Sequence, residues 1–233
     1  MQKIVVFSGA GVSADSGIPT YRSADGLWAN YRIEDVCTPE ALARDRETVI
    51  RFYNERRREM MSKEPNAGHY AIAGLERHFD VEVVTQNIDN LHERAGSSRV
   101  THLHGELTKL RSSANPDLIV ALDGWEQHSD ACAPDGSPLR PHIVFFGEAV
   151  PMFDAAARIV ASADILIVVG TSLAVYPAAS LVNYVRDRQV PIYLVDPADP
   201  RIAFVRNAVT HIKAPSAAGM PELAKRLVEE YAE

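Results

Sequence analysis

The sequence predicts an α/β fold, in which a doubly wound, Rossmann-like parallel sheet carries a smaller inserted lobe. Short runs of Val and Ile without polar alternation recur along the chain, as expected of parallel strands that are buried on both faces. Stretches of helical length and periodicity lie between these runs, which favours an open sheet with helices on both faces. The predicted strands are Ile4–Phe7, Val81–Val84, Ile143–Phe146, Ile165–Val169 and Ile192–Val195.

We expect a single domain, residues 1–233, built in two parts. The Rossmann-like part comprises residues 1–32, 76–105 and 142–233. Its predicted helices are Asp154–Ala163, Ala178–Arg188 and Pro221–Tyr231. Two segments without the strand–helix alternation form the small lobe, residues 33–75 and 106–141. A ligand would lie in the cleft between the two parts, at the carboxyl ends of the strands.

The two inserted segments differ in character. Residues 33–75 predict helices, since Thr38 is a good N-cap and Pro39 takes the first helical position after it. Residues 106–141 contain several prolines and glycines, and only the run Leu118–Leu122 could pair as a strand. The small lobe therefore combines a helical segment with a loop-rich one.

Composition excludes several classes of protein. With 46% hydrophobic and 24% charged residues, the chain has the composition of a folded globular domain. A net charge of −7 argues against nucleic acid as a partner, because such binding requires clustered Lys and Arg. The longest apolar run, Ile165–Val169, is far shorter than the ~18 residues of a membrane span. Ile4–Phe7 is too short for the core of a signal peptide, so we expect a cytoplasmic protein without a membrane partner.

The first predicted strand ends in a glycine-rich turn, Gly9-Ala10-Gly11-Val12-Ser13-Ala14. Glycines in this pattern let the backbone approach a pyrophosphate, and the N–H groups of the following helix face its charge. A dehydrogenase would also need an acidic residue about 20 residues later, at the end of a second strand. Here the chain runs through Pro19 and Gly26 instead. The turn predicts a dinucleotide site without hydride transfer; the alternative is a tight turn that binds nothing.

Two further polar clusters follow predicted strands. The segment Gln86–His92 crowds polar side chains at the end of a central strand, where burying them is costly unless they are hydrogen-bonded. The segment His102–Glu106 contains His104, which precedes a glycine that permits close backbone approach. Histidine is the usual general base near neutral pH. Taken alone, a histidine beside a strand end is more often structural, and this alternative stays open for His104.

A series of motifs spans almost the whole chain: Gly9–Ser13, Ser16–Pro19, Tyr21-Arg22, Gly26–Trp28, Gln86–Asp89, His104-Gly105, Phe146–Glu148 and Gly170–Ser172. Their order is that of the sirtuin family. Their spacing resembles the short bacterial class III sirtuins, which are NAD-dependent protein lysine deacylases. The resemblance implies NAD as a consumed co-substrate and acylated lysines in proteins or peptides as the partners of a monomeric enzyme.

The resemblance also implies a role for each matching residue. The phosphates and the nicotinamide ribose of NAD would contact Gly9, Ala10, Gly11, Ser13, Ala14, Gly17, Ile18, Tyr21, Arg22 and Trp28. Gln86 would hold ribose hydroxyls. The nicotinamide pocket would be lined by Asn87, Ile88 and Asp89, of which Asn87 and Asp89 would be catalytic. The adenosine side would be held by Gly170, Thr171, Ser172, Asp196 and Ser216.

In the family's reaction, the acyl-lysine carbonyl oxygen attacks the anomeric carbon of the nicotinamide ribose and nicotinamide leaves. His104 would then be the general base on the ribose hydroxyls, and the products would be free lysine, nicotinamide and O-acyl-ADP-ribose. The substrate peptide would add as a strand between the backbone edges of Phe146, Gly147, Glu148, Val175 and Tyr176. Two alternatives stay open: a protein ADP-ribosyltransferase, and a non-catalytic module that senses NAD or acyl-lysine.

The acyl group is predicted to end in a carboxylate. Four residues spaced 4, 3 and 4 share one face of the helix after Pro39: Val49, Tyr53, Arg56 and Met60. An arginine that points inwards from an apolar stripe needs an anion, and its planar fork matches a carboxylate. The Tyr-x-x-Arg pattern resembles class III sirtuins, which implies succinyl or malonyl groups, and the small Ala24 would leave room for them. Arg57 and Arg58 are expected to be solvated; the alternative is that Arg56 is solvated too.

Most sirtuins carry two Cys-x-x-Cys pairs that bind a structural zinc, and this chain departs from that pattern. Ser112 and Asn115 stand where the first pair is expected, and Cys132 and Asp135 stand where the second is. Serine and asparagine are poor zinc ligands, so we expect no structural zinc. Cys37 is the only other cysteine, so neither a disulfide framework nor a four-cysteine zinc site can form.

Something else must then hold the loop-rich segment together. We expect Leu118–Leu122 and Trp125 to pack as a small apolar core. The alternative is a makeshift metal site built from His128, Cys132 and Asp135.

Two other departures from the family are smaller. Phe145 replaces the usual tryptophan before the Phe-Gly-Glu element, which is expected to alter packing only. Asp196 replaces the asparagine common near the adenosine ribose. Since a carboxylate accepts from both ribose hydroxyls, NAD should be favoured over NADP.

Overall fold

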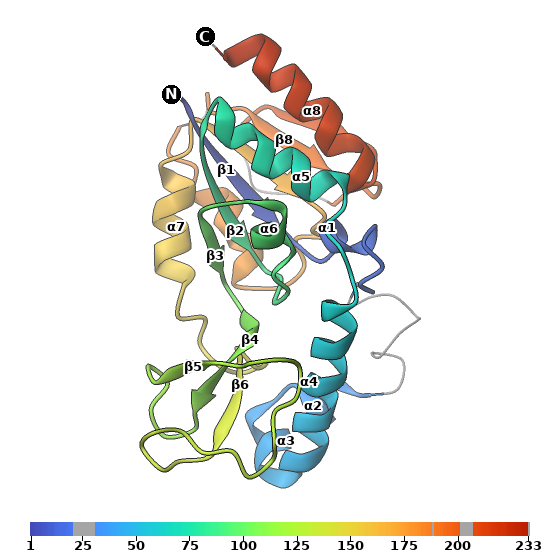
Figure 1. Ribbon diagram of the computed structural model, residues 1–233. Coiled ribbons are helices and arrows are strands. Elements are labelled where there is room, and N and C mark those ends of the chain that lie inside the picture. The colour runs from blue at the N-terminus through green and yellow to red at the C-terminus, as the bar shows by residue number, and fades with distance from the viewer. Residues whose placement is uncertain (21–30, 188, 201–206, 233) are drawn as a thin grey trace.

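The computed structural model describes residues 1–20, 31–187, 189–200 and 207–232. Its main sheet has six parallel strands in the order β3-β2-β1-β7-β8-β9 (Figure 1). The strands are β1 Lys3–Ser8, β2 Asp80–Thr85, β3 Val100–His102, β7 Ile165–Val169, β8 Ile192–Val195 and β9 Val209–Ile212. The strand order reverses between β1 and β7, which is where open α/β sheets bind ligands. The predicted doubly wound fold is confirmed.

The two faces of the sheet bury alternate side chains of each strand. In β1, Ile4 and Val6 pack against α5 and α8, whereas Val5 and Phe7 pack against α7 and η3. All four side chains are fully buried, so no polar alternation remains and the strand reads as a continuous apolar run. The covering elements are α5 Ala67–Gly74 and α8 Ser216–Tyr231 on one face, and α7 Phe153–Ala161 and η3 Ala178–Tyr184 on the other.

The helices differ from prediction in three places. Residues 67–75 were expected in the small lobe, but they form α5 and the start of η2, and Ile72 packs with α8 on the sheet because this face would otherwise be bare (Figure 1). Helix α8 begins before Pro221, which lies inside it. The helix expected over Ala178–Arg188 is a 3-10 helix, η3, that ends at Tyr184. None of the helices in the described ranges is long and apolar enough to cross a membrane.

The small lobe combines three helices with an antiparallel sheet of order β5-β4-β6. The elements are α2 Ile33–Val36, α3 Pro39–Arg44, α4 Arg46–Met61, β4 Gly105–Ser112, β5 Ile119–Ala121 and β6 Leu139–Ile143. Thr38 caps α3 as predicted, its hydroxyl accepting a first-turn N–H at 3.0 Å. The helix then stops, because Asp45 caps a new helix, α4, by accepting the Thr48 N–H at 3.0 Å. The stripe that begins at Val49 therefore lies on α4, the second helix after Pro39.

The run Ile143–Phe146 is not a strand of the parallel sheet, which corrects the prediction. β6 ends at Ile143 and pairs antiparallel with β4. Ile143 and Phe145 are buried because they pack against Phe52 and Tyr53 of α4. Burial under a helix produces the same apolar run as burial inside a parallel sheet, so composition could not separate the two.

Hydrogen bonds join three of the four positions at which most sirtuins carry zinc-binding cysteines: Ser112, Asn115 and Asp135. Ser112 donates to the Asp135 carboxylate at 2.7 Å, and its oxygen accepts the N–H groups of Ala114 and Asn115 at 3.1 and 2.8 Å. Ser137 donates to the same carboxylate at 2.7 Å. Among the residues that the structure describes, no three His, Cys, Asp or Glu side chains are grouped to hold a metal ion.

The expected apolar core of this segment forms in part: Leu118, Val120 and Leu122 pack in it, whereas Ile119, Ala121 and Trp125 do not. The residues that pack together are Leu110, Leu118, Val120, Leu122, Ala131, Ala133 and Leu139. Trp125 stays 37% exposed, because its ring lies under the Arg58 guanidinium at 5.6 Å rather than in the core.

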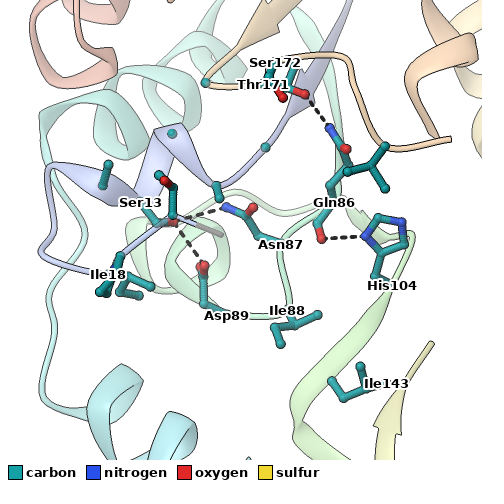
Figure 2. Close-up of a pocket in the computed structure, with 18 of the residues that line it drawn as sticks. Ser13, Ile18, Gln86, Asn87, Ile88, Asp89, His104, Ile143, Thr171 and Ser172 are labelled. Atoms are coloured by element: carbon teal, nitrogen blue, oxygen red, sulfur yellow. Dashed lines mark hydrogen bonds between the residues drawn. The ribbon is translucent and has the colours of Figure 1, made fainter. Parts of the chain in front are cut away.

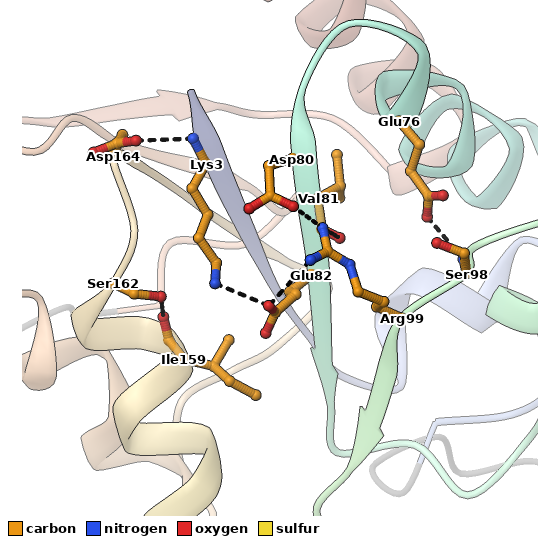
Figure 3. A network of polar contacts seen from close by, with 10 residues as sticks. All are labelled: Lys3, Glu76, Asp80, Val81, Glu82, Ser98, Arg99, Ile159, Ser162 and Asp164. Atoms are coloured by element: carbon orange, nitrogen blue, oxygen red, sulfur yellow. Dashed lines mark hydrogen bonds and ion pairs between the residues drawn. The ribbon is translucent and has the colours of Figure 1, made fainter. Parts of the chain in front are cut away.

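At the amino ends of the strands lies a polar network (Figure 3). Lys3 of β1 pairs with Glu82 of β2 at 2.8 Å, and Arg99 bridges Glu82 and Asp80. The backbone N–H of Lys3 also donates to Asp164 at 2.9 Å. These partly exposed pairs link β1, β2 and the start of β3 side by side, and each contributes little free energy.

Candidate active site

The glycine-rich turn lies where the strand order reverses. The Gly9 N–H donates to the Val169 carbonyl at 3.0 Å, and the Gly11 N–H donates to the Gly170 carbonyl at 2.8 Å. A Cβ on Gly9 or Gly11 would come within 2.8 Å of Gly170 atoms, and Gly170 itself has a φ of +59°. These glycines are therefore required for close packing between the turns after β1 and β7, in addition to any contact with a ligand.

A cavity of about 670 Å³ opens beside this turn, between the two parts of the chain. The predicted cofactor residues along it are Gly9, Ala10, Gly11, Ser13, Ala14, Ile18, Gln86, Asn87, Ile88, Asp89, His104, Gly170, Thr171, Ser172, Asp196 and Ser216. The predicted substrate residues along it are Tyr53, Arg56, Phe146, Gly147, Glu148, Val175 and Tyr176. Gly17 does not line the cavity; its φ of +80° marks it as a turn residue. Tyr21, Arg22, Ala24 and Trp28 lie outside the described residues.

Ser13 joins two polar residues of the segment after β2 (Figure 2). Its hydroxyl donates to the Asp89 carboxylate at 3.1 Å and accepts the Asn87 amide at 3.2 Å. The Leu91 N–H donates to the other Asp89 oxygen at 3.1 Å. Burial raises the pKa of Asp89, and the hydrogen bonds from Leu91 and Ser13 offset this only in part. The arrangement fixes the Asn87 amide with its nitrogen towards Ser13.

His104 is held from the opposite wall of the cavity (Figure 2). Its Nδ1 lies 3.0 Å from the Gln86 carbonyl, which can only accept, so Nδ1 carries the proton and Nε2 is the basic nitrogen. The Gln86 side chain in turn donates to Thr171 at 2.9 Å. Burial lowers the pKa of His104, against the opposing effect of the Gln86 bond. His104 is therefore a neutral imidazole at neutral pH, the protonation state that a general base needs.

The glycine after His104 permits close backbone approach, as expected. Gly105 has a φ of +82°, and a Cβ there would collide with the His142 carbonyl of β6. The backbone that approaches closely is therefore the neighbouring strand of the small sheet. This contact anchors the His104 segment to the small lobe.

Helix α4 places Tyr53 and Arg56 on the cavity. The next two arginines, Arg57 and Arg58, differ in burial. Arg57 was expected to be solvated and is 1% exposed, which corrects the prediction. Its guanidinium donates to the Leu107 carbonyl at 2.7 Å and to Asn54 at 2.6 Å, because α4 packs against β4 on this side. Burial lowers the pKa of Arg57 to about 10. Arg58 is exposed, as expected.

The Glu148 side chain turns into the small lobe, although its residue borders the cavity. Its carboxylate accepts from Arg140 at 2.6 Å, from Arg111 at 3.1 Å and from the Phe145 N–H at 2.8 Å. Burial raises the pKa of Glu148, but the hydrogen bonds and charges of these partners outweigh it and hold the pKa below its usual range. Glu148 therefore anchors the loop of Phe146 and Gly147.

The far end of the cavity is formed by Asp196 and Ser216. Burial raises the pKa of Asp196, whose carboxylate accepts the Ala198 N–H at 2.8 Å. The Ser216 hydroxyl donates to the Val12 carbonyl at 3.1 Å. Ser216 starts α8, so this bond ties the last helix to the glycine-rich turn.

Comparison with known proteins identifies the family. A family model described as the Sir2 family matches residues 9–177, well over half of the chain. The chain belongs to the Sir2 family. It is 57% identical over 206 residues to an NAD-dependent protein deacylase of Aggregatibacter actinomycetemcomitans, covering 88% of this chain and 97% of that one.

Solved Sir2 structures are similar over nearly the whole chain. A Sir2 homologue in complex with NAD aligns with a TM-score of 0.87 at 38% identity, covering 97% of this chain and 90% of that one. A Sir2 variant with a deacetylated p53 peptide and 3′-O-acetyl-ADP-ribose aligns with a TM-score of 0.80 at 30% identity, covering 98% and 93%. The resemblance drawn from the motifs is thus confirmed for the family.

This Sir2-family site also contains residues that the motifs did not single out. Cys37 and Phe145 line the cavity next to Tyr53, and Arg111 and Arg140 hold Glu148. Arg111 lies between Leu110 and Ser112, and Arg140 lies between Leu139 and Pro141, so neither stands in an apolar run that would have marked it as buried. No local pattern marked Cys37, since it reaches Tyr53 only through the fold.

Proposed function

We propose that this Sir2-family chain is an NAD-dependent protein lysine deacylase that prefers succinyl- and malonyl-lysine over acetyl-lysine. Support for NAD comes from the residues of the cavity and from the similarity to a Sir2 homologue–NAD complex. Support for the acidic acyl preference comes from one observation. Tyr53 and Arg56 line the same cavity as His104, so a cation lies in the chamber that contains the candidate base.

The residues that line the cavity fit a reaction between NAD, at its nicotinamide–ribose bond, and the amide of an acyl-lysine. NAD supplies an anomeric carbon whose leaving group is already cationic, so the protein must chiefly position the reactants and move one proton. Asn87 and Asp89, both fixed by Ser13, would orient the nicotinamide end. Gln86 would hold ribose hydroxyls, and His104 would accept a proton from them at Nε2.

Substrate binding would use both lobes. An extended peptide would add as a strand beside Gly147 and Val175, which both line the cavity. The Arg56 guanidinium would bind the acyl carboxylate bidentately, and the Tyr53 hydroxyl would add a third hydrogen bond. We also propose that the protein is a cytoplasmic monomer. We propose that it binds no structural zinc and has neither nucleic acid nor a membrane as a partner.

The acyl preference is tested with peptides of one sequence carrying succinyl-, malonyl- or acetyl-lysine, with NAD turnover followed by mass spectrometry. We expect the succinyl-to-acetyl ratio of kcat/KM to exceed one. Arg56→Met should lower that ratio by about 10- to 100-fold, the value of one charge-assisted pair. Arg58→Met, an exposed arginine two residues along α4, is the matched control. A wild-type protein that prefers acetyl-lysine, or an Arg56→Met variant with the wild-type ratio, contradicts the proposal.

The two alternatives predict different products. A protein ADP-ribosyltransferase would leave the ADP-ribose of labelled NAD on protein, whereas a deacylase places it in a small O-acyl-ADP-ribose. A sensing module would bind NAD without releasing nicotinamide. Release of nicotinamide that depends on acyl-peptide would eliminate the sensing module. His104→Ala should then abolish formation of O-acyl-ADP-ribose, because His104 acts after nicotinamide has left.

A further inference from the structure

One wall of the cavity brings a thiol to the hydroxyl of Tyr53. Cys37 follows α2 and is 4% exposed, and its Sγ lies 3.4 Å from the Tyr53 Oη. Both residues line the cavity, as does Arg56. The Cys37 carbonyl accepts the Phe146 N–H at 2.9 Å, which fixes the backbone that carries the thiol.

The Tyr53 ring has little freedom to turn. It stacks on Phe145, with ring centroids 5.8 Å apart and planes 24° from parallel, and the Arg140 guanidinium lies 4.1 Å from the Phe145 centroid. Tyr53 is 2% exposed. Because the ring is fixed, the one adjustable feature of this side chain is the direction of its hydroxyl proton.

In the hydrogen bond between Tyr53 and Cys37, either the phenol or the thiol can be the donor. If Tyr53 donates to the sulfur, no proton remains for a substrate. If the thiol donates to Oη, the phenolic proton is free for another acceptor. Thiol sulfur is a weak acceptor and a carboxylate is a strong one. An acidic acyl group beside Arg56 therefore favours the second direction.

The protonation states allow either direction, because both groups keep their protons. Burial raises the pKa of the Cys37 thiol to about 11, although the Tyr53 hydrogen bond and the Arg56 charge lower it. Burial also raises the pKa of Tyr53 well above its ordinary value. Both groups thus keep their protons at neutral pH, and Arg56 acts electrostatically on both of them.

We propose that Cys37 is a positioning residue for acyl selection: its thiol donates to the Tyr53 oxygen and thereby directs the phenolic proton at the carboxylate of the acyl group. This inference rests on the proposed deacylase function, and it adds the group that orients the hydroxyl proton of Tyr53. Cys37 acts through Tyr53 and does not itself touch the reacting atoms.

The test compares Cys37→Ala with Cys37→Ser. Both side chains are small, but only serine keeps a proton donor at this position. The measured quantity is the succinyl-to-acetyl ratio of kcat/KM for peptides of one sequence. We expect Cys37→Ala to lower the ratio about tenfold, and Cys37→Ser to keep it within about threefold of the wild type.

Three results separate this inference from the proposed function. A wild-type protein without an acidic acyl preference contradicts the proposed function itself. A wild-type preference that Cys37→Ala retains overturns only the role of Cys37. Equal loss of selectivity in the alanine and serine variants also overturns it, because the thiol would then act through packing rather than through its proton.

A second measurement does not depend on any Cys37 variant folding. Cys132→Ser leaves Cys37 as the only thiol, since the chain has two cysteines. The infrared S–H stretching band is then expected at the position of a hydrogen-bonded donor and should shift further when succinyl-peptide binds. A band typical of a free thiol, in both the absence and the presence of this peptide, overturns the inference.

Discussion

We predict that the hydrogen bonds of Ser112 stabilise the loop-rich segment of the small lobe, residues 106–141. Ser112 is 2% exposed, and its oxygen accepts the N–H groups of Ala114 and Asn115 at 3.1 and 2.8 Å. Ser112→Ala deprives both groups of their acceptor. Each such bond contributes about 1 kcal/mol net, so the free energy of unfolding should fall by about 2 kcal/mol. For a chain of this length, Tm should fall by about 4–8 °C.

Thermal unfolding followed by circular dichroism measures this change. Ser113→Ala is the matched control, since Ser113 is the exposed neighbour in sequence and only its backbone is bonded here. We expect the control to melt with the wild type, and a chelator to leave the wild-type Tm unchanged. A Ser112→Ala variant that melts with the wild type refutes the reasoning, and a Tm that falls on chelation points to a bound metal instead.

Three further predictions concern charge. Because burial lowers the pKa of His104, the acidic limb of kcat/KM against pH should lie below 6.5; a limb at or above 6.5 would contradict a neutral buried base. Burial lowers the pKa of His69 to about 4, so His69 binds a proton more readily in the unfolded chain than in the folded one. Between pH 7 and pH 5 the wild type should therefore lose about 2 kcal/mol more free energy of unfolding than His69→Gln, as measured by urea unfolding. Glu148→Gln removes the counter-charge of Arg111 and Arg140 and should raise the peptide KM about tenfold with little change in the KM for NAD; equal changes in both would show general damage.

The parallel sheet could be predicted because its strands are buried on both faces. Val5 and Val6 face opposite layers and are both apolar, so the strand is visible without any contact information. The edge strands gave weaker signals: Val209–Ile212 has exposed and half-buried side chains, and Val100–His102 has three residues. Neither has the apolar run that marks a central strand.

The site residues were predictable where a motif lies in one stretch of chain. Ser13, Asn87 and His104 meet at the carboxyl ends of strands, and the topology of an open sheet brings such ends together. Arg57 and Cys37 were not predictable in this way. Buried Arg57 donates to the Leu107 carbonyl, and the Cys37 thiol contacts the Tyr53 hydroxyl. Both contacts form only because α4 packs against other parts of the chain, which no local sequence pattern shows.

A crystal structure with NAD and a succinyl-lysine peptide would test the proposed chemistry most directly. We expect the nicotinamide ribose to lie beside His104, with Nε2 within hydrogen-bond distance of a ribose hydroxyl, and the succinyl carboxylate to contact Arg56. NAD bound outside this cavity, or an imidazole turned away from the ribose, would contradict the proposed role of His104.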